Sequence, residues 1–216
     1  MLSTIAVQLT LEHRRRVGRL ADLTAADAEP HLRSFDSADI DGWWQRVANL
    51  ILSVVTAGFD VAGALAGDYL AQHAAIEGVS LDPVTAEVDV ARVIAAMQAQ
   101  TVARAKKQIG DGQDSDTVRR LLLRRGTGTV RRLTAAGSRE TILETFDQRP
   151  VIVGYRRVTA SDACSFCLML AGRGAVYRSQ QAASGVAGRP RGTRRVGQSY
   201  HDHCRCTVEP LYDFDL

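Results

Sequence analysis

The sequence predicts an α+β protein, with a mainly helical N-terminal body over residues 1–150 and a small β-containing C-terminal module over residues 151–216. Two observations carry this prediction. Apolar residues recur at three-and-four spacing through most of the first part, as on one face of a helix. After Pro150 the chain changes to VIVGYRRVT, its first β-branched and extended run. With 216 residues and 45% hydrophobic content, the chain can bury a sizeable core.

Turn and capping residues divide the helical body. A first helix is expected over residues 9–23, because Pro30 then interrupts the pattern. A long second helix is expected from an N-cap at Asp36 or Ser37 to about Ile76. The second half of this helix is rich in alanine and glycine, a composition that suits close contact with other helices.

The later elements follow from the same kinds of signal. Pro83 is expected to begin a third helix, which ends near the loop-like stretch KKQIGDGQDSD. A further helix is expected over residues 115–135, disturbed at RGTG, and Ser138 is expected to cap another. The strand VIVGYRRVT and a short strand at TVEPLY complete the prediction.

The net charge of +3 is modest, but the arginines are unevenly placed. Residues 117–138 hold six arginines and no acid; the pattern favours the solvated face of an amphipathic helix, with phosphate contact as the alternative. Residues 163–201 hold six more, again without an acid. The segment GRPRGTRR in this second run is too basic to pack, so we expect it to contact DNA or an acidic protein surface through Arg189, Arg191, Arg194 and Arg195.

The four cysteines form two pairs, one of them beside histidines. Cys164 and Cys167 are spaced C-x-x-C, a common way for one turn to present two thiolates to one ion. The stretch YHDHCRC adds further donors: His201, His203, Cys204 and Cys206. Zinc usually takes four such ligands, so only some of these side chains bind it. The sequence therefore predicts a zinc clip at the base of the loop between the pairs, with five candidate ligands: Cys164, Cys167, His201, Cys204 and Cys206.

Two other interpretations of the cysteines stay open. They could be packed free thiols, or the C-x-x-C could be a redox pair, although the βαβ context of a thioredoxin-like site is missing. The sequence shows no secretory signal, and its most apolar run, ANLILSVVTAGF, is too short to span a bilayer. We therefore expect a reducing cytoplasm and no membrane partner, conditions under which clustered cysteines indicate metal binding rather than disulfides.

Catalysis is not favoured by the sequence. A Cys/His pair is available for nucleophilic chemistry, but the same cysteines are better used as metal ligands. The chain has neither a G-x-S-x-G elbow nor an HExxH zinc-protease motif. No catalytic residue is assigned, and whether the protein is an enzyme stays open, with a non-enzymatic role preferred.

The run GYRRVTASDACSFCLMLAGRGAVY, followed by YHDHCRCTVEP, resembles the phage head morphogenesis proteins, the Mu F-like minor capsid proteins. It is most similar to the type found in actinobacteriophages, often labelled capsid maturation protease. The family pattern is a basic strand, a C-x-x-C, a small-residue turn and a final H-x-x-C-R-C. Cys164 and Cys167 match the first pair, and the final element is matched by His201, Cys204, Arg205 and Cys206. The resemblance covers residues 154–210.

The resemblance implies a role in procapsid assembly. It implies a minor capsid protein that acts near the portal, with the portal and the capsid or scaffold proteins as partners; its basic loops could meet either DNA or one of these proteins. It implies a location in the host cytoplasm during assembly and then in the capsid interior of the virion. Two alternatives remain: a capsid maturation protease that trims capsid or scaffold protein, and a zinc-ribbon nucleic-acid binder without a phage context.

Overall fold

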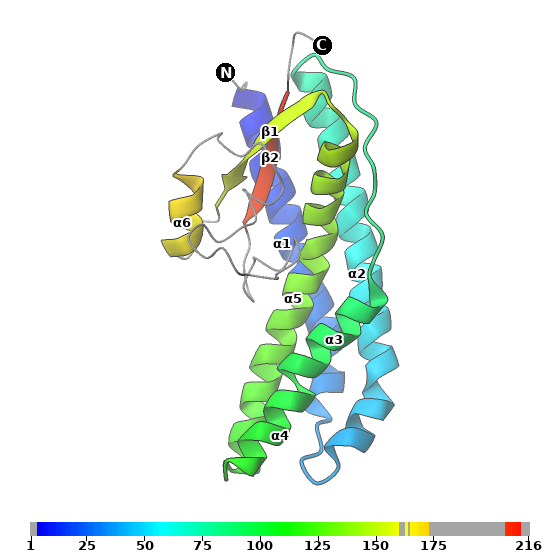
Figure 1. The fold of residues 1–216 in the computed structure, drawn as a ribbon, viewed down its shortest axis with the longest axis vertical. Coiled ribbons are helices and arrows are strands. Elements are labelled where there is room, and N and C mark those ends of the chain that lie inside the picture. The colour runs from blue at the N-terminus through cyan, green and yellow to red at the C-terminus, as the bar shows by residue number, and fades with distance from the viewer. Residues whose placement is uncertain (1–3, 160–162, 164, 173–205, 213–216) are drawn as a thin grey trace.

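The computed structural model describes residues 4–159, 163, 165–172 and 206–212. Three long helices run side by side along the long axis of the molecule and contact one another pairwise (Figure 1). They are α1 (Thr4–Arg33), α2 (Ile40–Ile76) and α5 (Ser115–Gln148). Two shorter helices, α3 (Val90–Gln100) and α4 (Val102–Gly110), pack against the lower half of this bundle in the view of Figure 1.

A small antiparallel sheet lies at the other end of the bundle. Strand β1 (Ile152–Val158) pairs with β2 (Thr207–Tyr212), from Ile152 opposite Tyr212 to Val158 opposite Thr207. Helix α6 (Ser165–Ala171) packs on β1. Both strand predictions are confirmed, as is the mainly helical body with a small β-containing part near the C-terminus.

The sheet shares a core with the helices. One apolar cluster fills the bundle and includes Trp43, Ile51, Met97, Leu122 and Val130. A second cluster joins the upper halves of α2 and α5 to both strands, through residues such as Leu70, Ile142, Tyr155 and Val208. The ring of Tyr155 meets that of Phe146 edge to face, with centroids 5.0 Å apart. Five of the six residues of β2 are buried, so this strand is covered on both of its faces.

Helix α5 is continuous, so the predicted break at RGTG and the predicted new helix at Ser138 are both wrong. The glycines lie where α5 touches its neighbours. A Cβ atom at Gly126 would stand 2.9 Å from Leu32 side-chain atoms, and one at Gly137 would stand 2.0 Å from the backbone oxygen of Phe59. Close contact with α1 and α2 therefore compensates for the low helix propensity of glycine.

The Gly137 contact gives a testable consequence. We expect Gly137→Ala to lower the free energy of unfolding by about 1–3 kcal/mol, because the added methyl group meets rigid backbone rather than a flexible side chain. Gly18→Ala is the matched control, since a Cβ at that position in α1 has no atom within 4 Å and alanine favours the helix. Urea unfolding of both variants checks this; equal stability of the two would contradict the close contact.

The segment between α2 and α3 is extended, so the prediction that Pro83 begins a helix is also wrong. Two threonines on successive turns of α5 hold the segment. The hydroxyl of Thr145 accepts a hydrogen bond from the Val84 amide at 2.9 Å, and that of Thr141 accepts one from the Ala86 amide at 3.1 Å. These side chains satisfy backbone donors that a helix would otherwise satisfy.

Helix ends differ from prediction in two further places. Pro30 does not stop α1, which continues to Arg33. The missing amide of Pro30 falls in the last turn, where losing one hydrogen bond costs little. The N-cap of α2 is Asp39 rather than Asp36 or Ser37, and its carboxylate accepts a hydrogen bond from the Gly42 amide at 2.9 Å.

Helix α2 is longer and more continuously apolar than the short run considered in the sequence. By length and composition alone it could cross a membrane. Core helices of folded proteins meet the same criterion, and one side of α2 packs against α1 and α5.

Candidate functional site

The two described cysteines lie at the same end of the sheet. Cys206 directly precedes β2, whose first residue, Thr207, pairs with Val158 at the end of β1. Cys167 lies on α6, which begins seven residues after Val158 and packs on β1. Cys167 is 1% exposed and Cys206 is 4% exposed. The topology thus brings one thiol from each predicted pair to a common region.

An arginine from the sheet reaches the first thiol. Arg157 on β1 is 3% exposed, and its Nη1 lies 3.5 Å from the Sγ of Cys167. A guanidinium beside sulfur stabilises negative charge on it, and the thiolate is the form that binds zinc. This contact suits a metal ligand at Cys167.

The full set of ligands stays a prediction. Cys164, His201 and Cys204 lie outside the described residues, as do Arg189, Arg191, Arg194 and Arg195 of the basic segment. Within the described ranges, no three His, Cys, Asp or Glu side chains gather as a metal-binding group. The described part therefore contains two of the five predicted ligands, Cys167 and Cys206.

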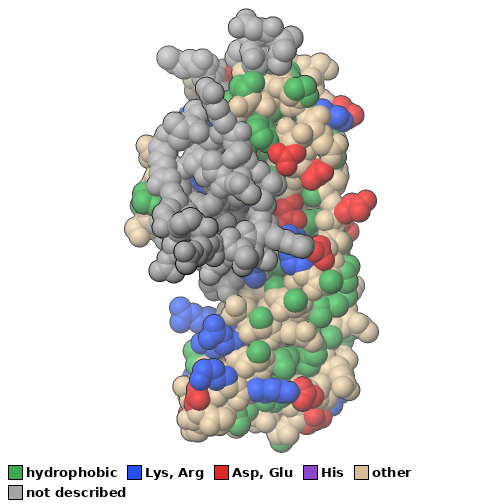
Figure 2. All heavy atoms as spheres, in the orientation of Figure 1, with side chains coloured by type: hydrophobic (Ala, Val, Ile, Leu, Met, Phe, Trp, Pro, Cys, Tyr) green, Lys and Arg blue, Asp and Glu red, His purple; other side chains and the backbone are tan. Residues whose placement is uncertain are grey.

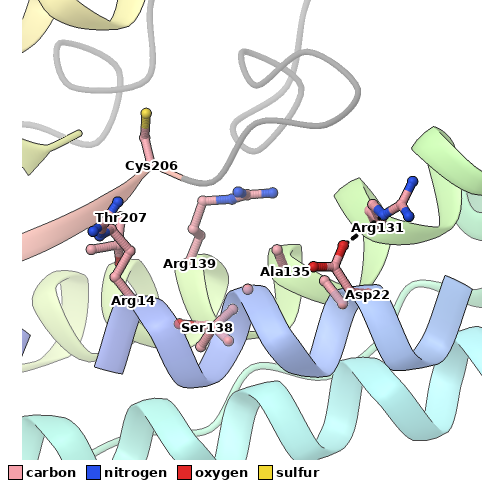
Figure 3. Close-up of a pocket in the computed structure, with 11 residues that line it drawn as sticks. Arg14, Asp22, Arg131, Ala135, Ser138, Arg139, Cys206 and Thr207 are labelled. Atoms are coloured by element: carbon pink, nitrogen blue, oxygen red, sulfur yellow. Dashed lines mark hydrogen bonds and ion pairs between the residues drawn. The ribbon is translucent and has the colours of Figure 1, made fainter. Parts of the chain in front are cut away.

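A pocket lies next to Cys206 (Figure 3). Its empty volume, including the part that is open to solvent, is about 420 Å³. It lies between α1, α5 and the start of β2. Its lining includes one carboxylate, Asp22, and the three arginines Arg14, Arg131 and Arg139. Arg131 donates through Nε to Asp22 at 2.8 Å and so ties α5 to α1. The excess of guanidinium groups gives the lining a net positive charge, which suits an anionic group.

A second constellation is centred on the buried carboxylate of Glu209 in β2. The residue is fully buried, and side chains from three other elements meet it. Arg156 on β1 donates through Nε to Oε2, and Thr10 on α1 donates to Oε1 at 2.7 Å. The Nε2 of His73 on α2 lies 3.7 Å from Oε1. Glu209 therefore links the sheet to two helices of the bundle.

The direction of the hydrogen bonds around Thr10 follows from its single hydroxyl proton. Its Oγ1 lies 2.7 Å from Oε1 of Glu209, 2.9 Å from the hydroxyl of Tyr69 and 3.0 Å from the backbone oxygen of Ala6. The charged carboxylate is the nearest and strongest acceptor, so Thr10 donates to Glu209. Tyr69 then donates to Thr10, and a chain runs from Tyr69 through Thr10 to Glu209.

His13 extends this network toward α5. Its ring stacks on that of Tyr69, with centroids 4.4 Å apart, and its Nε2 lies 2.9 Å from the Oγ of Ser138. Burial, with a smaller contribution from the charge of Arg16, lowers the pKa of His13 from 6.5 to about 4. His13 is therefore neutral at physiological pH.

The charge states within the network are also fixed by burial and pairing. Burial by itself raises the pKa of Glu209, but the neighbouring His73 ring and the hydrogen bonds from Arg156 and Thr10 outweigh it, and the net pKa is lowered. Burial raises the pKa of Tyr69 and of Tyr212, so both hydroxyls stay protonated. The arrangement is an ionised carboxylate held by cationic and hydroxyl donors, which is a structural anchor between the two parts of the chain.

No local motif in the sequence predicts this network. Its two histidines are isolated in the sequence, yet His13 is 3% exposed and His73 is fully buried. Two signals were available. His73 follows Tyr69 by four residues on the apolar side of α2, and Glu209 stands within the apolar strand TVEPLY, where a charged residue needs partners.

The first basic run is divided between surface and bundle. Arg119, Arg120 and Arg124 are exposed near the start of α5, whereas Arg131 is half-buried against Asp22. Figure 2 shows Lys and Arg side chains grouped at the end of the molecule where α4 and α5 meet. Asp and Glu side chains lie among them, and Lys106, Lys107 and Arg119 pair with Asp41, Asp111 and Asp116.

Residues 5–215 match the model of a protein family described as VG15 protein. The match includes the helical bundle as well as the sheet, whereas the resemblance found in the sequence covers residues 154–210 only. No curated protein and no solved structure matches the chain. Because the family match extends over nearly the whole sequence, the chain belongs to the VG15 protein family, a viral family of phage proteins.

Proposed function

We propose that this phage protein is a minor capsid, or head morphogenesis, protein that acts in procapsid assembly near the portal. The observation that carries the proposal is membership of a viral protein family over residues 5–215, in a chain that also has the C-x-x-C and H-x-x-C-R-C elements. The role is structural: the helical bundle docks on the portal or shell. The C-terminal module then presents its arginines to DNA or to an acidic protein surface.

A zinc ion would organise the C-terminal module. The candidate ligands are Cys164, Cys167, His201, Cys204 and Cys206. The positions of Cys167 and Cys206 at one end of the sheet support a shared ion, as does the guanidinium of Arg157 beside Cys167. Such an ion would cross-link the two ends of the segment between the cysteine pairs. The buried carboxylate of Glu209 would hold the sheet, next to which Cys167 and Cys206 lie, against the helical bundle.

The protease alternative has less support. A nucleophilic thiol must reach its substrate, and Cys167 and Cys206 are both buried.

Assembly in cells tests the proposed function. The protein is coexpressed with the portal, scaffold and major capsid proteins of the same phage, and particles are purified and analysed by mass spectrometry. We expect a few copies per particle and a loss of correctly formed procapsids when the gene is omitted. Particles that form normally without the protein and never contain it would contradict the proposal. A specific shortening of the capsid or scaffold protein would instead favour the protease.

Metal analysis tests the zinc clip separately. We expect about one zinc per chain in elemental analysis of purified protein, and loss of most of it in Cys167→Ser and Cys206→Ser. Ser165→Ala, on the same helix as Cys167, is the matched control and should keep its zinc. A chelator should lower the melting temperature of the wild type but not of the cysteine variants. Metal-free wild type, prepared without chelator, would rule the clip out.

A further inference from the structure

The outward side of α2 carries a stripe of mostly apolar residues with a seven-residue repeat. Spacings of four and three alternate along it, as in one helix of a coiled coil. We call these positions the α2 stripe: Leu50, Val54, Ala57, Val61, Ala64, Asp68, Ala71 and Ala75. All are exposed except Val54, which is half-buried, and Leu50 and Val61 are each 49% exposed.

The stripe lies opposite the side of α2 that packs in the bundle. Ile51, Val55, Phe59 and Ala62 are at most 1% exposed and form that inner side. A surface helix normally presents polar residues to solvent. Helix α2 is instead apolar enough on both sides to meet the composition criterion for a membrane span. A continuous, periodic apolar stripe of this kind indicates a contact surface rather than scattered exposed residues.

Opposite charges flank the part of the stripe from Leu50 to Ala64. Arg46 lies one turn before Leu50, and Asp68 lies 22 residues after Arg46 on the same side of the helix. At a rise of about 1.5 Å per residue, these charges are about 33 Å apart, so they cannot pair within one chain. The residue midway between them is Ala57.

We propose that the chain forms a symmetric dimer through the α2 stripe, with the two α2 helices antiparallel and crossing at Ala57. Each Arg46 then lies opposite Asp68 of the second copy, which gives two intermolecular ion pairs. Leu50 faces Ala64 of the second copy, so large and small side chains interdigitate. This self-complementary pattern is what a two-fold interface requires. Among the described residues Arg46 pairs with Asp39 at 3.4 Å, and it can exchange this exposed contact for the intermolecular pair at little cost.

A second copy fits the stripe better than a lipid bilayer does. Asp60 lies on the exposed side of α2, near the middle of its apolar stretch, and would have to enter the hydrocarbon region with it. In a protein–protein contact Arg46 and Asp68 pair between the two copies, where they set orientation and register.

Sedimentation velocity of the full chain over a wide concentration range tests the dimer. We expect Leu50→Glu to be monomeric, because it places a charge in the apolar contact. Arg46→Asp and Asp68→Arg each put like charges opposite one another at both ends, and each should raise the dimer dissociation constant about tenfold. The double variant should return to within about threefold of the wild type. Arg104→Asp, an exposed charge reversal on α4, is the matched control.

The double variant gives the decisive result, since restoration cannot come from contacts within one chain. Circular dichroism checks that each variant folds. We expect that all of them do, because the substituted side chains are exposed. A wild type that stays monomeric, a dimer that survives Leu50→Glu, or a double variant as weak as the single ones would overturn the proposal. Monomeric wild type that floats with phosphatidylcholine–phosphatidylglycerol vesicles would overturn it too, and would assign the stripe to a membrane.

Discussion

Replacing Glu209 by alanine is expected to lower the free energy of unfolding by about 3–5 kcal/mol. The change leaves Arg156, His73 and Thr10 without the carboxylate that they surround in a buried region. Thr10 and His73 are buried, so no water replaces the carboxylate there, whereas the side chain of Arg156 is 36% exposed and regains part of its hydration. Urea unfolding at neutral pH measures the effect.

Two further variants separate charge from shape at this position. Glu209→Gln keeps the size of the side chain and its acceptor for Thr10 but removes the negative charge, so we expect a smaller loss of about 2 kcal/mol. Glu12→Gln removes the carboxylate of an exposed pair with Arg16, and it should change stability by at most about 0.5 kcal/mol. If Glu209→Ala were within 1 kcal/mol of the wild type, the anchor would not hold the sheet to the bundle.

Local sequence patterns predict the elements whose signals are local. The end of α2 at Ile76 and both strands were predictable, because helical spacing and β-branched composition are properties of the segment itself. The continuity of α5 was not. Its RGTG segment discourages a helix locally, and the helix is maintained by Leu32 and Phe59, which lie far away in the sequence. Tertiary packing overrides propensity there.

In the candidate site, too, one part has a local sequence signal and the other depends on tertiary packing. The spacing of Cys164 and Cys167 indicates metal chemistry before any fold is known. The Glu209 network gives no such local motif, because its members come from α1, α2, β1 and β2. Each of them looks ordinary in its own segment. Only the register of the sheet and the packing of the helices decide that His73 meets Glu209.

Lowering the pH from 7 to 5 is expected to cost the wild type about 2 kcal/mol of stability through His13 alone. The folded protein holds the pKa of His13 at about 4, below its usual 6.5, because the ring is buried. Between these two values the unfolded chain binds a proton that the folded chain does not. The stability contributed by the neutral imidazole is therefore complete above pH 6.5 and is lost as the pH falls toward 4.

Glu209 titrates in a different window, which allows the two groups to be separated. Its pKa in the folded protein is below the ordinary 4.5, so its contribution is present above that value and is lost only at lower pH. Measurements between pH 7 and pH 5 therefore leave the anchor ionised, and the difference between the wild type and a His13 variant in this window reports on His13.

Urea unfolding of His13→Phe and Ser138→Ala at several pH values completes the test. Phenylalanine keeps a ring to stack on Tyr69 but cannot take up a proton, so about 2 kcal/mol of pH dependence should disappear. Ser138→Ala also removes the hydrogen bond to His13 but keeps the imidazole, and its pH dependence should stay like that of the wild type although its stability is lower. A wild type and a His13→Phe variant with the same slope would show that His13 is accessible to protons in the folded state. The close packing of α1 against α2 and α5 around this ring argues for the opposite result, because a charged imidazole could form there only if the helices separated.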